Sequence, residues 1–151
     1  MPRSYDHATP NLSSKPMWLD QFMTPQDIFN QHVRAGMLAD AEAKTALYTP
    51  TGIYEAPLAH ENGPYPHRLE GHNALHTGFT IIHDLAKHST RQIDPTNSRF
   101  TLHTTTDPDI FIVELDAAFT NAPPVPLVQI YRLHEGKIAH LRDYFAPDTT
   151  L

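Results

Sequence analysis

The sequence predicts an α+β fold in which three N-terminal helices pack on one face of a curved, mostly antiparallel sheet. Two observations favour this class. Apolar residues recur at helical spacing in the first part of the chain, and the period changes to two from residue 99 onward. Short turns rich in Pro, Asn, Asp and Gly separate the later segments, which is typical of consecutive antiparallel strands. Helices followed by such strands define the α+β class.

The first helix is predicted to begin at Thr24 and to end near Gly36. Thr24 can accept a hydrogen bond from a free backbone N–H, and Pro25 suits the first helical position. Asp27 lies at the positive end of the helix dipole. The apolar face at helical spacing consists of Ile28, Phe29, Val33 and Met37.

Shorter elements are expected before the third helix. The alanine-rich segment 40–48 predicts a second helix that Pro50 and Gly52 end. A short strand over 53–58 and a loop over 59–70 follow.

The third helix is predicted to begin at Gly71 or His72. Gly78 lies beside its apolar stripe, where a neighbouring element could approach closely. The stripe consists of Leu75, Phe79, Ile82 and Leu85. Four strands are then expected over 99–106, 110–119, 125–134 and 137–145.

The chain has 151 residues, which corresponds to about one domain. Residues 1–23 are rich in Pro and Ser and are expected to be a tail or arm, with residues 24–151 as the domain. Within the tail, Met17, Trp18 and Leu19 could pin it to the body or to a second subunit.

Composition excludes several classes of function. The net charge is −6 and no Lys/Arg run occurs, so binding to nucleic acid or anionic lipid is not expected. No apolar stretch approaches the roughly 18 residues of a membrane helix. We also find no signal peptide, so a cytoplasmic location is expected. The absence of cysteine excludes disulfides, thiolate zinc sites and cysteine nucleophiles.

Asp143 is the most informative candidate for chemistry. In the last predicted strand, alternation places Ala139, Leu141, Asp143 and Phe145 on one face, where Asp143 is the only ionisable group. Burial beside apolar groups raises the pKa of a carboxyl, which suits a general acid or base near neutral pH. The alternative is an ordinary solvated or amide-bound carboxylate.

Two further candidates lie on predicted strands. Asp116 shares a strand face with Glu114, and the two carboxylates face either water or the polar wall of a pocket. Tyr54 shares its face with Ala56 and Leu58, so its hydroxyl either donates into a cavity or is satisfied within the core.

Histidines flank the stripe of the third helix. His72 and His76 are four residues apart, a spacing that could hold a metal, and His83 lies on the same side. No third ligand is assignable from the sequence, so no metal is expected. His76 either reaches into a pocket or is solvated. No nucleotide-binding or flavin motif occurs, so no cofactor is expected.

The order of these motifs resembles the SnoaL-like branch of the nuclear transport factor 2-like superfamily over residues 24–148. The resemblance rests on Gly-Ile-Tyr-Glu-Ala-Pro at 52–57, Arg-Leu-Glu-Gly-His at 68–72 and Arg-Asp-Tyr-Phe-Ala-Pro at 142–147. Together with Asp-Pro-Asp-Ile-Phe-Ile-Val-Glu at 107–114, the ending looks most like phenazine-biosynthesis A/B proteins.

The resemblance implies a cone-shaped sheet around a pocket for a small hydrophobic molecule, and a homodimer. It also implies cofactor-free acid–base chemistry, with Asp143 as an essential acid and His76 as a pocket histidine. The chain departs from epoxide-hydrolase relatives, because 114–116 is Glu-Leu-Asp without their arginine. It also has Thr-Pro-Thr at 49–51, where isomerase-type members place an acid.

Three functions follow from these features. The first is an enzyme that isomerises, cyclises or dehydrates a hydrophobic carbonyl compound, with Asp143 moving the proton and Tyr54 and His76 stabilising the oxyanion. The second is a non-catalytic binder of small ligands with the same fold. The third is an epoxide hydrolase-like enzyme in which Asp143 and Asp116 share a water molecule.

Overall fold

The structure is a computed structural model that describes residues 23–147. The predicted tail therefore lies outside the described residues, together with Met17, Trp18 and Leu19. Met23 is its one described residue, and it packs against the core.

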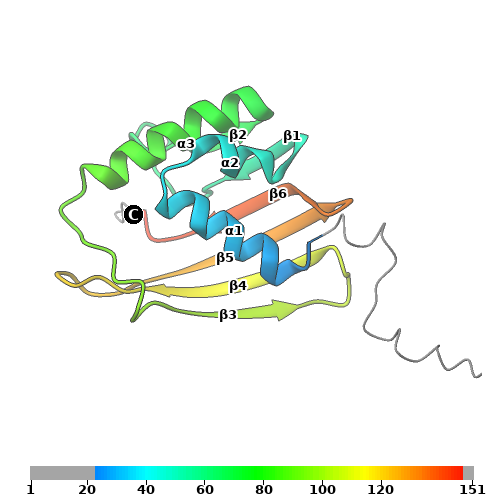
Figure 1. Cartoon of the computed structure of the whole chain (residues 1–151). Helices are drawn as coiled ribbons and strands as arrows, with labels where there is room; N and C mark the ends of the chain where they lie inside the picture. The colour runs from blue at the N-terminus through cyan, green and yellow to red at the C-terminus, as the bar shows by residue number, and fades with distance from the viewer. Residues whose placement is uncertain (1–22, 148–151) are drawn as a thin grey trace, which may run out of the picture.

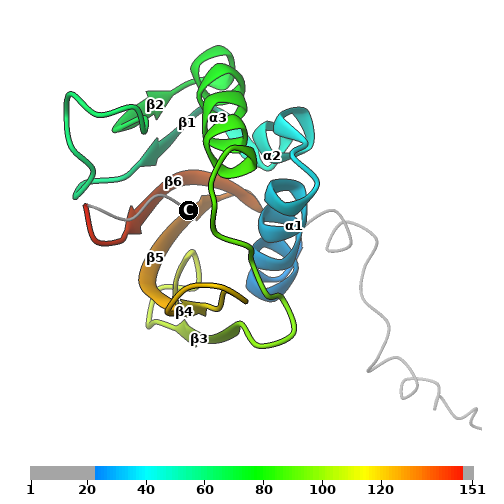
Figure 2. The same ribbon diagram turned by 90° about the vertical axis from the view of Figure 1, so that its left-hand side faces the viewer.

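Within the described residues, three helices precede most of a six-stranded sheet whose strand order is β2-β1-β6-β5-β4-β3. The sheet curves, and the helices lie on its inner side (Figures 1 and 2). The elements are α1 (Pro25–Met37), α2 (Ala41–Ala46), β1 (Tyr48–Glu55), β2 (Arg68–Glu70), α3 (His72–Lys87), β3 (Arg99–Thr104), β4 (Ile110–Ala117), β5 (Val125–His134) and β6 (Lys137–Tyr144). The predicted α+β class with a curved sheet is confirmed. No helix of the described segment has the length and apolarity needed to cross a membrane.

Local hydrogen bonds fix both ends of α1. The Thr24 hydroxyl accepts a hydrogen bond from the Asp27 N–H at 3.2 Å, and the Asp27 carboxylate accepts one from the Thr24 N–H at 3.1 Å. The helix continues one residue past Gly36, and Ala39 then adopts a φ of 53°. The Asp40 N–H donates to the Ala35 carbonyl, which completes a Schellman end.

The predicted boundary between the second helix and the first strand is wrong. Helix α2 ends at Ala46, and β1 already begins at Tyr48, so Pro50 and Gly52 lie inside the strand. The ladder between β1 and β6 is irregular here, since the register shifts between Tyr48 and Ile53. An irregular ladder tolerates a proline that has no N–H to donate. Strand β2 was not predicted and lies within the expected loop.

The remaining strands match the predicted segments, although three of them end one or two residues earlier. Strand β6 pairs antiparallel with β5, and it pairs parallel with β1 on its other side. A second register shift separates Arg132 from Leu133 in the β5–β6 ladder. It brings Ile138 into the core, whereas Ala139, which was predicted to share the face of Leu141, is only half-buried.

The inner face of the sheet forms the core together with α1 and α3. Phe111 of β4 and Tyr131 of β5 stack there, with ring centroids 4.5 Å apart and planes 8° apart. Phe79 of α3 is fully buried between the rings of Tyr48 and Tyr54, with each centroid 5.6 Å away. Aromatic rings thus link helices and sheet around one interior.

The predicted close approach at Gly78 is present. An added Cβ at Gly78 would lie 2.2 Å from Leu69 Cδ1, because β2 packs directly against α3 there. We expect Gly78→Ala to lower the free energy of unfolding by about 1 kcal/mol. Overpacking lowers stability by about 1–3 kcal/mol. This loss is larger than the gain of up to about 1 kcal/mol that replacing glycine by alanine brings to a helix.

Urea unfolding of a double-mutant cycle with Leu69→Ala measures this effect. In the Leu69→Ala background the space is open, so Gly78→Ala should stabilise the protein instead. The same sign in both backgrounds would refute the packing explanation.

Candidate active site

The candidate site is centred on Asp143 of β6. This side chain is buried on the inner face of the sheet, and the residue is 7% exposed. Its Oδ2 atom accepts a hydrogen bond from the Tyr54 hydroxyl at 2.8 Å. Its Oδ1 atom is also buried but has no hydrogen-bond partner in the structure. One oxygen of the carboxyl group is therefore held by Tyr54, while the other is buried without a partner.

Strand pairing positions the site. Tyr54 of β1 lies opposite Leu141 of β6, and Asp143 follows two residues later on the same face. On the other side of β6, Asp143 lies opposite Gln129 of β5. The Gln129 Oε1 atom accepts a hydrogen bond from the Tyr131 hydroxyl at 2.8 Å. Three neighbouring strands thus contribute polar groups to one buried region.

Tyr65 connects this region to the surface. It comes from the loop between β1 and β2 and is half-buried. Its hydroxyl lies 2.8 Å from that of Tyr54. Because Tyr54 donates its hydrogen to Asp143, Tyr65 donates to Tyr54. The Tyr65 ring also packs edge-on against Phe145, with a centroid distance of 5.1 Å.

Burial dominates the electrostatics of the carboxyl group. Desolvation raises the pKa of Asp143 to about 6, and the Tyr54 hydroxyl, the side chain of Gln129 and the charge of Lys44 partly oppose this rise. Burial and the charge of Asp143 also raise the pKa of Tyr54. Tyr54 therefore remains a neutral donor, while Asp143 titrates close to neutral pH.

Each of the three helices contributes one basic side chain to the interior, and the charge of one of them, Lys44, acts on Asp143. His32 of α1 is buried, and its Nε2 atom lies 2.9 Å from the Tyr48 hydroxyl. Lys44 of α2 places Nζ 4.9 Å from the centre of the Phe79 ring. His83 of α3 is buried, and neither of its ring nitrogens has a hydrogen-bond partner. Desolvation lowers the pKa of all three groups, to about 8 for Lys44.

The structure brings two of the four sequence-predicted residues together, Asp143 and Tyr54. Asp116 lies elsewhere. It is exposed and pairs with Pro126 of β5, whereas Asp143 pairs with Gln129 of the same strand. Positions 126 and 129 have opposite parity, so the two carboxylates lie on opposite faces of the sheet. A water molecule shared by Asp116 and Asp143 is incompatible with this placement.

His76 is also not brought to the site. It is exposed on α3, while the inward positions of that helix are Leu75, Gly78, Phe79, Ile82 and His83. His76 and His83 are seven residues apart and share a side of the helix. Only His83 is buried. Its pKa is lowered by burial and by the charge of Lys44 on α2, while the charge of Asp40, the N-cap of α2, acts to raise it. The third histidine of the set, His72, lies 3.0 Å from the Tyr48 carbonyl oxygen.

Known structures with similar architecture were found. A presumed isomerase from Bacillus subtilis is 22% identical, with a TM-score of 0.59 over 83% of this chain and 91% of its own. A hypothetical protein from Catenulispora acidiphila with a ketosteroid isomerase-like fold, solved with trimethylamine, is 17% identical, with a TM-score of 0.56 over 85% and 92%. An epoxide hydrolase/cyclase-like enzyme of pyran ring formation in salinomycin is 19% identical, with a TM-score of 0.52 over 80% and 89%. An NTF2-like protein from Cytophaga hutchinsonii also matches, with a TM-score of 0.54 over 83% and 92% at 13% identity. The fold is therefore NTF2-like. No family model matches the sequence, and no curated protein does.

The sequence missed several residues of this NTF2-like interior, although a signal existed for two of them. Gln129 is a polar residue on the apolar face of β5, which is the same pattern that identified Asp143. His32 lies four residues after Ile28 on the buried face of α1. No signal exists for Lys44, since lysines on short helices are mostly exposed. None exists for Tyr65, which lies in an irregular loop.

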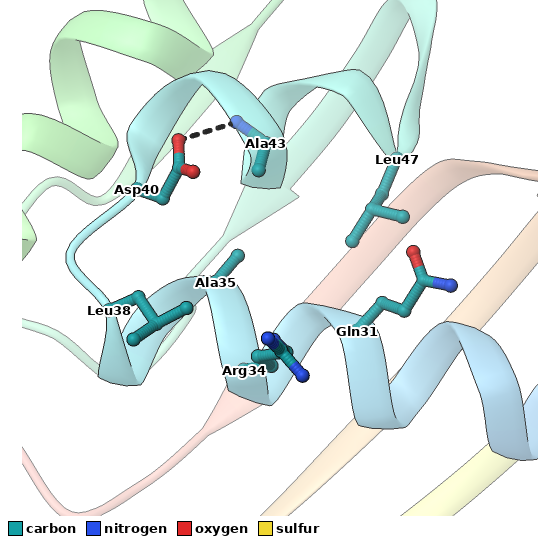
Figure 3. Close-up of a pocket in the computed structure, with 7 residues that line it drawn as sticks. All are labelled: Gln31, Arg34, Ala35, Leu38, Asp40, Ala43 and Leu47. Carbon is teal, nitrogen blue, oxygen red and sulfur yellow. Dashed lines mark hydrogen bonds between the residues drawn. The ribbon is translucent and has the colours of Figure 1, made fainter.

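The two cavities described do not contain Asp143. One, of about 490 Å³, lies between α1 and α2 and is lined by Gln31, Arg34, Ala35, Leu38, Asp40, Ala43 and Leu47 (Figure 3). The carboxylate among these lining residues is that of Asp40, the N-cap of α2, and it accepts a hydrogen bond from the Ala43 N–H at 2.9 Å (Figure 3). The other, of about 380 Å³, includes Asp116 and Tyr144. No group of three or more potential ligands in residues 23–147 is arranged to hold a metal ion.

The raised pKa of Asp143 predicts a pH-dependent cost to the NTF2-like fold. The unfolded carboxyl ionises near pH 3.9, whereas the folded one holds its proton to about 6. The folded state therefore binds more protons between these values, and stability falls as the pH rises from about 4 to about 6. We expect Asp143→Asn to raise the free energy of unfolding at pH 7 by about 1–3 kcal/mol.

Urea unfolding of both proteins at pH 4 and pH 7 measures this difference. The variant should be close to wild type at pH 4, where the folded carboxyl is protonated. A variant that is less stable than wild type at pH 7 would show that the carboxylate is well solvated or paired.

Proposed function

We propose that this protein is an enzyme that performs cofactor-free acid–base chemistry on a small hydrophobic carbonyl compound. The observation that carries the proposal is the buried Asp143 carboxyl, which has one oxygen held by Tyr54 and the other without a partner. A pKa of about 6 makes this group mostly ionised at neutral pH, yet more basic than an ordinary aspartate.

The free oxygen of Asp143 removes a proton from the carbon next to the carbonyl group. Negative charge then develops on the carbonyl oxygen of the substrate. Once Asp143 is protonated, its Oδ2 atom becomes a weaker acceptor, and the Tyr54 hydroxyl is released to donate to the new oxyanion. Returning the proton to a different atom completes an isomerisation, and attack by the enolate completes a cyclisation.

The surroundings suit an apolar substrate. Leu141 of β6 and Phe145, which directly follows this strand, are buried on either side of Asp143, and the ring of Phe79 lies against Tyr54. Burial strengthens the few electrostatic contacts of the site, because water does not screen them. The names of two similar structures, a presumed isomerase and an epoxide hydrolase/cyclase-like enzyme, support this reaction class.

The alternative is a small-ligand binder with the same interior. It is favoured only if Asp143 has no role in chemistry, since a binder does not need an available carboxylate oxygen. The predicted homodimer, the kinship with phenazine-biosynthesis proteins and the cytoplasmic location stay predictions.

Proton exchange tests the proposal without knowledge of the natural substrate. A panel of enolisable ketones in D₂O is followed by NMR for loss of the α-proton signal. We expect Asp143→Asn to lower the exchange rate by at least about 100-fold and Tyr54→Phe by about 10- to 100-fold. The wild-type rate should rise with pH through about 6 and then level off, because only the ionised carboxylate accepts a proton.

Asp116→Asn is the matched variant, since it removes an exposed carboxylate on the opposite face of the sheet. It should exchange at the wild-type rate. Equal loss of rate in both aspartate variants would contradict the proposal, because Asp116 cannot reach a substrate that is bound at Asp143. Binding of a ketone without exchange above the buffer rate would favour the binder.

A further inference from the structure

Lys44 is a half-buried lysine whose amine the proposed mechanism does not use. Its Nζ atom lies over the face of Phe79, and a Cβ added at Gly36 would be 3.4 Å away from it. The amine is thus placed beside the last turn of α1 and above a ring of α3. Within residues 23–147, no carboxylate oxygen lies within 4 Å of it.

Burial and the charge of Asp143 have opposite effects on the pKa of Lys44, and the effect of burial is the larger one. Burial lowers its pKa to about 8, although the carboxylate of Asp143 on β6 acts to raise it. His32 on α1 and His83 on α3 also lie within range of the lysine charge, and each has a lowered pKa. The neighbouring histidines are therefore neutral when the amine is uncharged.

Groups able to move protons lie in the same interior with hydrogen bonds unmade. Both ring nitrogens of His83 lack partners, and so does the Oδ1 atom of Asp143. The Lys44 amine lies over the ring of Phe79, and His83 follows Phe79 by one turn of α3. Asp143 is hydrogen-bonded to Tyr54, whose ring packs against Phe79. A structural lysine is most often paired with a carboxylate, and Lys44 has no carboxylate oxygen within 4 Å among the described residues.

We propose that Lys44 is a nucleophile that condenses with the carbonyl carbon of a small aldehyde or ketone. The lone pair of the neutral amine forms the C–N bond, and the amine loses a proton to a neighbouring base. The resulting carbinolamine oxygen is protonated and leaves as water, and a C=N⁺ bond forms. Hydrolysis by water reverses the sequence, so no oxidant or reductant is consumed.

The surrounding groups supply what this step needs. In this proposal His83, a base within range of the Lys44 charge, accepts the proton from the amine and returns it to the departing hydroxyl group. The iminium then acidifies the adjacent C–H bond, and the Oδ1 atom of Asp143 is available to remove that proton. This adds covalent catalysis to the interior, whereas the direct reaction proposed above needs only Asp143 and Tyr54.

Reductive trapping of the full chain tests the proposal. The protein is incubated with butanal and sodium cyanoborohydride at pH 7, and the alkylated lysines are located by peptide mass mapping. Exposed Lys87 and Lys137 serve as internal controls. With a pKa of about 8, about one-tenth of Lys44 is neutral at pH 7, against about 1 in 2,500 for a lysine near 10.4.

We expect Lys44 to be alkylated at least about tenfold faster than either control, since the lower nucleophilicity of a weaker base offsets only part of this difference. Pentane-2,4-dione provides a second readout, because its condensation with an amine yields a conjugated enaminone that absorbs in the near ultraviolet. Lys44→Met should abolish the fast phase of both reactions, and Lys137→Met should leave it unchanged.

Asp143→Asn separates this proposal from the acid–base function. Because the carboxylate raises the pKa of Lys44, its removal leaves more neutral amine, and trapping at Lys44 should persist while proton exchange is lost. Equal alkylation of Lys44 and the two exposed lysines in the wild-type chain would overturn the proposal. That comparison requires no variant to fold.

Discussion

The candidate site depends on the parallel pairing of β1 with β6. These strands are far apart in the sequence, and their ladder brings Tyr54 to within hydrogen-bond distance of Asp143. The register shift between Tyr48 and Ile53 sets which face of β1 carries Tyr54. A slip by one residue would turn the hydroxyl to the outer face, where Glu55 instead contacts His140 and Arg142.

The interior combines an aromatic core with groups that a purely structural core would not contain. His83 and Asp143 are buried and Lys44 is half-buried, and none of the three forms an ion pair within 4 Å in the described chain. Desolvation without full compensation costs stability. Such groups cluster where their altered proton affinity is used, which is the argument for a functional interior here.

Sequence patterns predicted the sheet better than the site. Alternation located Asp143, since a single carboxylate interrupts an apolar face, and it would have located Gln129 by the same rule. The start of β1 was missed because Pro50 and Gly52 usually end an element, and only the partner strand shows that they lie in an irregular ladder. A helical wheel cannot distinguish His76 from His83, because both lie on the same side of α3. Which of them is buried depends on where α2 packs.

Tyr65 covers the Tyr54 hydroxyl with a hydrogen bond that a ligand could replace. Its loop carries three prolines between residues 57 and 66, which restrict the backbone even when its contacts are broken. Displacing Tyr65 from Tyr54 breaks one neutral hydrogen bond, worth about 1 kcal/mol, and the edge-on contact with Phe145, worth about 0.5–1.5 kcal/mol. A ligand oxygen that interacts with Tyr54 in its place restores that bond. Entry of the ligand is in this sense a substitution of hydrogen-bond partners rather than an unfolding of the loop.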